Sequence, residues 1–341
     1  MTYLLVELDE TYNDELIKLS FTTNTGSDLF YVDRVPNFFH LSNGFGETRQ
    51  FGLFKNKELI GSVAVSMHYR LIGGICTKTY YLNDLRIHPS YQKTLAFYRM
   101  FQQLHSIYEK EGEVKWMFST VLDGNQNSSS FTKDTDILPR GKPIGKTVHI
   151  GIPLFIPLRQ KNAEYDIEEI KGHEAWPIFQ ELSKGKNFAP CDKRLFLGEN
   201  DIFLTIKNRK NEPLALCKLV DQSAARKLRY SENAPLSFKI LNLLCRLTGC
   251  PSLPGKDEEF KHAYMAFYAT KDSTYDYREA FLPYIQNQYK HRYTYLFFGV
   301  SELHAVTWRK RLFHIELSST TYGYGDLPGD TVINFHELTL I

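Results

Sequence analysis

Alternation of apolar and polar residues in the first part of the chain predicts a run of β-strands. The turn at 55–57 separates two alternating segments and predicts a hairpin, and the pair Gly73-Gly74 predicts the next turn. The last strand ends before Pro89, because the residue preceding a proline resists the helical conformation. The expected strands are 3–8, 49–54, 58–69 and 76–87.

A spacing of three and four residues between apolar side chains follows, and it predicts a helix over 91–108. A strand at 114–120 comes next, and the start of a short helix is expected at 125–131. The order strand, helix, strand predicts an α+β fold with a crossover connection. The expected apolar face of the helix is formed by Leu95, Tyr98, Met100, Phe101, Leu104 and Ile107.

The second half of the chain repeats this order of elements. The hairpin sequence FKNKELIGSVAV in the first half has a counterpart in IKNRKNEPLALCKL in the second. A duplication explains the repeat better than coincidence does. The expected strands of the second half are 167–170, 201–207, 213–220, 263–269 and 293–300, and its expected helices are 275–291 and 303–312.

A segment rich in proline and charge, 153–164, is the expected linker. We therefore expect an N-terminal domain at 1–157 and a C-terminal domain at 164–341. Residues 222–260 of the second half replace a tight turn of the first half, and they contain an expected amphipathic helix at 236–247. Gly323, Gly325 and Gly329 favour a mobile loop near the C-terminus.

Composition narrows the classes of function. A net charge of +2 provides no electrostatic reason to expect nucleic acid as a partner. The acidic start of the chain is unlike a signal peptide, and no apolar run approaches the roughly 20 residues that cross a bilayer. Five cysteines without a Cys-x-x-Cys pair favour a reduced, cytoplasmic protein, and the scattered histidines favour no metal site. We therefore expect neither a membrane nor a metal ion as a partner.

The segment 85–96, Leu-Arg-Ile-His-Pro-Ser-Tyr-Gln-Lys-Thr-Leu-Ala, joins the last strand of the first sheet to the helix. It resembles the signature of the GNAT superfamily of acyl-CoA-dependent N-acetyltransferases. In that superfamily a strand ends in a Val-x-Pro-like step, and an aromatic residue, an Arg or Gln and a glycine-rich turn open a helix. The resemblance covers about 3–155, and more loosely 166–341.

This resemblance implies an α+β protein of two tandem GNAT-like folds, each a mixed, mostly antiparallel sheet flanked by helices. It also implies acetyl-CoA or another acyl-CoA as co-substrate. Independently of the family, the free N–H groups and the dipole at the start of a helix attract an anion such as a diphosphate. The expected cofactor-binding residues are Leu85, Arg86, Ile87, Gln92, Lys93, Thr94, Leu95 and Ala96, with Asn125 and Ser128 from the segment after the next strand.

Asp84 is the candidate catalytic base, because it is the nearest carboxylate in the strand that often supplies one. An ion pair with Arg86 is an equally good interpretation of this residue. Tyr108 is a candidate proton donor, because Thr132 stands where the family often has tyrosine. Thr94 stands where the family has glycine in the phosphate turn. In the second half Asp272 would repel a diphosphate, so we expect no CoA there.

The sequence thus predicts an enzyme that moves an acyl group from CoA to an amine of a small molecule or peptide. The acyl chain length and the oligomeric state stay open, and a longer acyl or aminoacyl donor is an alternative. A noncatalytic GNAT-fold module that binds a ligand or a protein is the second hypothesis, which the departures at Thr94 and Thr132 favour.

Overall fold

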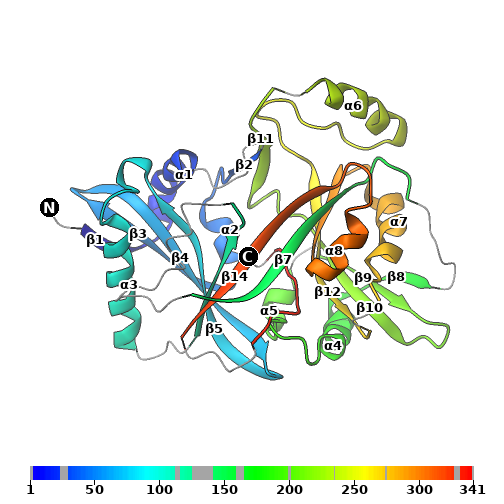
Figure 1. Cartoon of the computed structure of the whole chain (residues 1–341), viewed down its shortest axis with the longest axis horizontal. Helices are drawn as coiled ribbons and strands as arrows, with labels where there is room; N and C mark the ends of the chain where they lie inside the picture. The colour runs from blue at the N-terminus through cyan, green and yellow to red at the C-terminus, as the bar shows by residue number, and fades with distance from the viewer. Residues whose placement is uncertain are drawn as a thin grey trace.

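A single twelve-stranded sheet runs through the whole molecule, with helices packed along it (Figure 1). The computed structural model describes residues 3–23, 30–111, 116–124, 141–158, 165–198, 201–233, 235–272, 275–325 and 331–339.

The first half of the chain forms the strands that the alternation predicted. Asn56 and Lys57 both have positive φ, 52° and 68°, which is the geometry of the tight turn that joins two antiparallel strands. The predicted hairpin is therefore confirmed. The strands are β1 (Tyr3–Leu8), β3 (Glu47–Lys55), β4 (Glu58–Ile72), β5 (Ile75–Ile87) and β6 (Trp116–Leu122).

Helices of the first half cover both faces of its sheet. The crossover helix α3 (Ala96–Glu111) connects β5 to β6 and buries Met100, Phe101 and Leu104 against the strands. Leu95 and Tyr98 were predicted on this apolar face but are 61% and 39% exposed, because Leu95 precedes the helix and Tyr98 lies on its exposed side. The other elements are α1 (Asn13–Thr22), α2 (Phe39–Asn43) and the short strand β2 (Phe30–Asp33).

The second half has the same order of strands and the same crossover. Its strands are β8 (Asp166–Ile170), β9 (Ile202–Lys207), β10 (Pro213–Val220), β12 (His262–Thr270) and β13 (Tyr295–Val300). Its helices are α4 (Gly172–Leu182), α5 (Lys193–Phe196), the crossover α7 (Arg278–Tyr289) and α8 (Glu302–Trp308). In each half the crossover helix joins a parallel pair, β5 with β6 and β12 with β13.

Two long strands lie in the middle of the sheet, and each of them pairs with a strand from the other half of the chain. β14 (Ile315–Gly325), from the C-terminal part, pairs with β6 of the first half. β7 (Lys142–Pro153), from the first part, pairs with β13 of the second half, and β7 and β14 pair with each other (Figure 1). The full order is β1-β3-β4-β5-β6-β14-β7-β13-β12-β10-β9-β8.

This arrangement corrects two expectations from the sequence. Gly323 and Gly325 lie in the central strand β14 and not in a mobile loop, while Gly329 lies outside the described residues. β7, which was not predicted, takes up the residues just before the expected linker. The sheet is continuous across the predicted boundary between 157 and 164, and the duplication itself remains a proposal.

The predicted insertion at 222–260 contains β11 (Lys227–Tyr230) and the predicted helix, α6 (Leu236–Thr248). β11 pairs with β2, so the insertion joins the two halves through a second, two-stranded sheet. α6 lies at the outer margin of the molecule (Figure 1). Its outward face exposes Leu236, Ile240, Leu243 and Leu247 by 59% to 74%.

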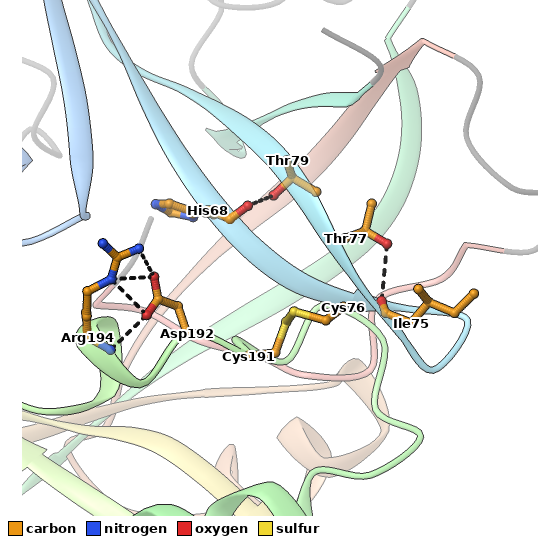
Figure 2. Close-up of a disulfide and its surroundings, with 8 residues drawn as sticks. All are labelled: His68, Ile75, Cys76, Thr77, Thr79, Cys191, Asp192 and Arg194. Atoms are coloured by element: carbon orange, nitrogen blue, oxygen red, sulfur yellow. Dashed lines mark hydrogen bonds and ion pairs between the residues drawn. A yellow bond between two sulfur atoms is a disulfide. The ribbon is translucent and has the colours of Figure 1, made fainter. Parts of the chain in front are cut away.

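A disulfide joins Cys76 on β5 to Cys191 in the segment before α5 (Figure 2). The same segment forms backbone hydrogen bonds with the end of β4, from the amides of Phe188 and Cys191 to the carbonyls of Leu71 and Tyr69. The expectation that all cysteines are reduced is therefore wrong for this pair. The two residues are 115 positions apart, and spacing along the chain gave no sign of their contact.

Candidate functional site

The parallel strands β5 and β6 run side by side for only three rows. Residues 80–82 of β5 pair with residues 117–119 of β6, whereas β5 continues to Ile87. Over residues 83–87, β5 keeps its pairing with β4 but has no strand on its other side in the described part of the chain. The backbone at the carboxyl end of β5 is therefore an open edge, and such an edge can pair with an extended ligand.

A β-bulge lies in β5 where the two strands part. Ser62 and Ala64 of β4 pair with Arg86 and Asn83, so β5 has one extra residue over this interval. Asp84 has φ of 51°, a conformation that aspartate adopts more readily than most side chains. A bulge bends its strand and redirects the side chains beyond it. The bulge therefore accounts for the divergence of β5 from β6.

Asp84 lies between two arginines inside the first half. Its Oδ2 accepts a hydrogen bond from Nη1 of Arg34 at 2.9 Å, and its Oδ1 lies 2.8 Å from Nη2 of Arg86. The side chains of Arg34 and Arg86 are 2% and 4% exposed, so water screens these charges only weakly. Burial opposes ionisation of Asp84, but the two guanidinium charges outweigh it and lower its pKa to about 2.

The predicted ion pair of Asp84 with Arg86 is therefore confirmed. Arg86 also donates to the carbonyl of Ser20 and the hydroxyl of Thr23 at the end of α1, so its side chain is directed into the protein. The role of Asp84 as a base stays a prediction. A carboxylate with so low a pKa is a weak base at neutral pH, which disfavours that role.

The turn between β5 and α3 is exposed, but most of its amides are already hydrogen-bonded. The N–H groups of residues 90, 91, 92, 94 and 96 donate to His88, Pro89, Tyr91 or Thr94 within the turn. Among the described residues, the amides of Lys93 and Leu95 have no acceptor. The side chains of residues 92–95 are exposed, although those of Gln92 and Thr94 form hydrogen bonds within the turn. The predicted anion site thus keeps an open surface and two free amides beside the cation of Lys93.

The other predicted binding residues contribute in different ways. Gln92 directs its side-chain amide to the carbonyl of Ile87, so it stabilises the turn from within. Leu85 packs partly buried against the core beneath α3, and Ala96 is fully buried. Asn125 and Ser128 lie outside the described residues.

Tyr108 is not brought to this turn. It lies in α3 twelve residues after Ala96, which is about 18 Å along the helix axis. Its side chain is 4% exposed and contacts the rings of Phe51 and Tyr80. The guanidinium group of Arg49 lies 5.3 Å from its ring centroid. The structure thus surrounds Tyr108 with core residues, and its predicted role as an acid gains no support.

One polar group at the point where β5 and β6 part was not predicted. Tyr324 of β14 forms a hydrogen bond of 3.0 Å with the hydroxyl of Ser119, which lies in the last paired row of β6. Burial raises the pKa of Tyr324, so its hydroxyl keeps its proton. The two residues are 205 positions apart, and only the position of β14 beside β6 brings them together.

The parallel pair of the second half parts in the same way. β12 and β13 pair over three rows ending at Tyr264 and Phe297, and Phe267 has φ of 50° where Asp84 has 51°. In the second half, the C-terminal segment 331–339 lies at the edge of β12 that corresponds to the open edge of β5. The buried carboxylate of Glu337 accepts the N–H of Phe267. This contact occupies one backbone N–H of the edge, and the absence of CoA from the second half stays a prediction.

No helix in the described ranges is long and apolar enough to cross a membrane. No cluster of three or more His, Cys, Asp or Glu side chains in the same ranges is placed to hold a metal ion.

Comparison with known proteins identifies the fold. Protein-family models and curated protein sequences give no significant match. N-myristoyltransferase from Saccharomyces cerevisiae, solved with myristoyl-CoA, matches with a TM-score of 0.62 and 11% identity, over 98% of this chain and 85% of that one. A GCN5-related N-acetyltransferase from Anabaena variabilis matches with a TM-score of 0.53 and 11% identity, over 94% and 72% of the two chains.

A protein from Enterococcus faecalis described as a probable N-acyltransferase matches with a TM-score of 0.53 and 6% identity, over 95% of this chain and 72% of that one. Identities this low establish a common fold only. The α+β architecture implied by the segment 85–96 is thereby confirmed, and the chain has the fold of the GNAT-like N-acyltransferases.

Proposed function

We propose that the protein is an acyl-CoA-dependent N-acyltransferase whose donor site lies where β5 and β6 part. The observation that carries this proposal is the open backbone edge of residues 83–87, directly followed by an exposed turn at the start of α3. The neighbour solved with myristoyl-CoA supports an acyl-CoA as the donor. An extended pantetheine arm fits an open strand edge, and a diphosphate fits a helix start.

Residues 85–87 provide backbone groups for the arm of the donor, except the carbonyl of Ile87, which accepts the side-chain amide of Gln92. The free amides of Lys93 and Leu95 and the ammonium of Lys93 attract the diphosphate, and the positive end of the α3 dipole adds to this attraction. Asp84 acts indirectly, because its ion pairs with Arg34 and Arg86 keep the bulge that separates the strands. Asn125 and Ser128 are proposed to complete the cofactor side.

In the reaction the amine nitrogen attacks the thioester carbonyl, the C–S bond breaks, the nitrogen loses a proton and the sulfur gains one. We assign the proton that reaches the sulfur to the hydroxyl of Tyr324, and the proton that the nitrogen releases to solvent restores that of Tyr324. Its support is the hydrogen bond to Ser119 at the row where the strands part; the raised pKa keeps the phenol protonated at neutral pH but makes it a weaker acid.

The acceptor is proposed to be the amine of a small molecule or peptide. Acetyl-CoA and longer acyl-CoAs both remain candidates for the donor, and the depth of the donor pocket decides between them. The predicted cytoplasmic location stays a prediction, and the disulfide between Cys76 and Cys191 argues against a strongly reducing compartment.

Calorimetric titration with acetyl-CoA and with myristoyl-CoA tests the donor site. We expect binding of at least one donor, weakened about tenfold by Lys93→Met, since a charged contact contributes on the order of 1.5 kcal/mol. Lys110→Met is the matched control, because Lys110 is an exposed lysine at the other end of the same helix. Absence of binding of both donors at millimolar concentration refutes the proposal.

A noncatalytic binding module is the second candidate function. It is favoured by the five turn amides that are already bonded and by the low pKa of Asp84. Measuring thiol release with a panel of amines separates the two functions. If the donor binds but no amine of the panel causes thiol release, the result supports the binding module. If thiol is released, and its rate is lower in the Tyr324→Phe variant, the result supports the enzyme.

A further inference from the structure

A pocket of about 720 Å³ opens in the second half, away from the proposed donor site. It lies where the end of β12, the starts of α7 and α8 and the C-terminal segment meet. Its polar lining consists of Glu181, Lys184, Lys186, Glu212, Thr270, Lys271, Tyr275, Asp276, Arg278, Ser301, His304, Asn334 and His336. The pocket therefore brings together four cations and two histidines from five separate parts of the chain.

The three carboxylates of this lining already have partners. Glu181 pairs with Lys184, and both side chains are more than 70% exposed, so this pair lies at the rim. Asp276 lies 2.8 Å from Arg278 and also accepts the indole N–H of Trp308. Glu212 accepts a hydrogen bond from the side-chain amide of Asn208, outside the pocket.

Lys186 has no counter-charge. Neither an ion pair nor a side-chain hydrogen bond is present at its ammonium within the described residues, although the side chain is only partly exposed. Burial and the charge of Arg278 lower its pKa to about 8. Burial, Arg278 and His304 likewise lower the pKa of His336, to about 3. Lys186 and Arg278 repel one another, and of the two only Arg278 has a carboxylate partner, so a bound anion relieves the uncompensated charge of Lys186.

Arg278 is a buried cation of the pocket lining, and its charge acts on Lys186. Its guanidinium group is 3.7 Å from the centroid of the Tyr268 ring and donates to the carbonyl of Gly299, so its position is constrained on several sides. Its side chain is only 7% exposed. This position holds Arg278 close enough to Lys186 for their charges to interact, although Asp276 compensates part of the charge of Arg278.

We infer that this pocket binds the oxyanion group, carboxylate or phosphate, of a small organic ligand, with Lys186 as its principal ion-pair partner. The ligand enters the second half, whose strand edge is closed by Glu337, and so it is separate from the acyl donor of the first half. The volume exceeds that of an inorganic ion, which indicates an organic molecule carrying the anionic group.

Thermal unfolding in sodium phosphate and in sodium acetate, each against sodium chloride at equal ionic strength, tests this inference. A site with a Kd of ~1 mM raises the folding constant about tenfold at ~10 mM anion. We expect such a stabilisation with at least one of the two anions. The anion that raises the melting temperature more shows whether the site prefers phosphate or carboxylate. Equal melting temperatures in all three salts overturn the inference.

Two variants make the test specific. Lys186→Met should weaken the effect of the anion at least tenfold, whereas Lys193→Met, which changes an exposed lysine of α5, should leave it unchanged. Equal losses in both variants indicate nonspecific charge screening and overturn the assignment. Since Lys186 must be protonated, the effect should also fade as pH rises through about 8.

Titration with acyl-CoA separates this site from the proposed function. Lys186→Met should bind acyl-CoA as the wild type does, because Lys186 is not part of the donor site. If phosphate stabilises the protein but no acyl-CoA binds, the anion pocket stands and the acyltransferase proposal fails. If acyl-CoA binding is lost together with the phosphate effect in Lys186→Met, the two sites are one and the inference is wrong.

Discussion

Replacement of Asp84 by asparagine tests whether the bulge in β5 depends on the buried charge cluster. Asparagine tolerates the positive φ of 51° about as well as aspartate, so the substitution removes the charge without straining the backbone. The change leaves Arg34 and Arg86 without a counter-charge while both stay buried.

The expected loss of stability follows from two estimates. The pKa of Asp84 falls from 3.8 to about 2 in the folded state, which corresponds to about 2–3 kcal/mol of stability at neutral pH. Removing one partner of a buried ion pair typically costs about 3–5 kcal/mol, because the remaining charge is uncompensated. We therefore expect Asp84→Asn to lower the free energy of unfolding by about 2–5 kcal/mol.

Urea denaturation at pH 7 measures this loss, and the double variant Arg34→Met/Asp84→Asn tests the coupling. Arg34→Met should cost less in the Asp84→Asn background than in the wild type, by about 0.5–3 kcal/mol. The pH dependence has a definite sign. Because the folded pKa is lowered, the contribution of Asp84 is fully present above pH 3.8 and is lost as pH falls toward about 2.

A change of less than about 0.5 kcal/mol in Asp84→Asn would refute the role of the cluster in stability. Should the variant also lose acyl transfer while keeping its stability, Asp84 would be a base and not a structural residue. The two roles are therefore distinguished by measuring unfolding and turnover on the same protein.

Three further predictions concern other parts of the molecule. Reduction of the disulfide between Cys76 and Cys191 releases a cross-link across 115 residues and should lower the free energy of unfolding by about 2–4 kcal/mol. The variant Cys76→Ser should lose the same stability, and its melting temperature should not respond to reductant. A wild-type melting temperature unaffected by dithiothreitol would contradict this prediction. Burial lowers the pKa of His262 to about 4, so its unfolded form takes up a proton first as pH falls below 6.5, and stability should decline by up to about 3 kcal/mol toward pH 4. His262→Gln should flatten this part of the pH curve in urea titrations, and a curve parallel to the wild type would exclude the contribution. A Cβ added at Gly299 would lie 2.6 Å from the carbonyl oxygen of His336. Gly299→Ala should therefore displace the C-terminal segment and lower the free energy of unfolding by about 1–3 kcal/mol, which thermal unfolding measures. An unchanged melting temperature would show that the segment moves without a loss of stability.

The candidate site was predictable only in its local parts. The turn at 89–95 and the helix after it were recognisable, because proline, turn residues and the helical spacing act over a few residues. The sequence did not show which amides of the turn are hydrogen-bonded, because this depends on the acceptors that the folded turn presents. The departure of β5 from β6 also required the structure, because it arises from a one-residue mismatch between β4 and β5.

The sequence by itself determined the strands β3, β4 and β5, the hairpin turn, the crossover helix α3 and the corresponding elements of the second half. Each of these follows from side-chain spacing or turn residues within about 20 positions. Tertiary structure alone decided the exchange of β7 and β14, because it depends on pairing between strands that are far apart along the chain, which no local pattern specifies. It likewise decided that Arg34 meets Asp84, that Tyr324 meets Ser119 and that Glu337 closes the edge of β12. These contacts join residues 50 to 205 positions apart, and no local preference along the chain specifies such pairs.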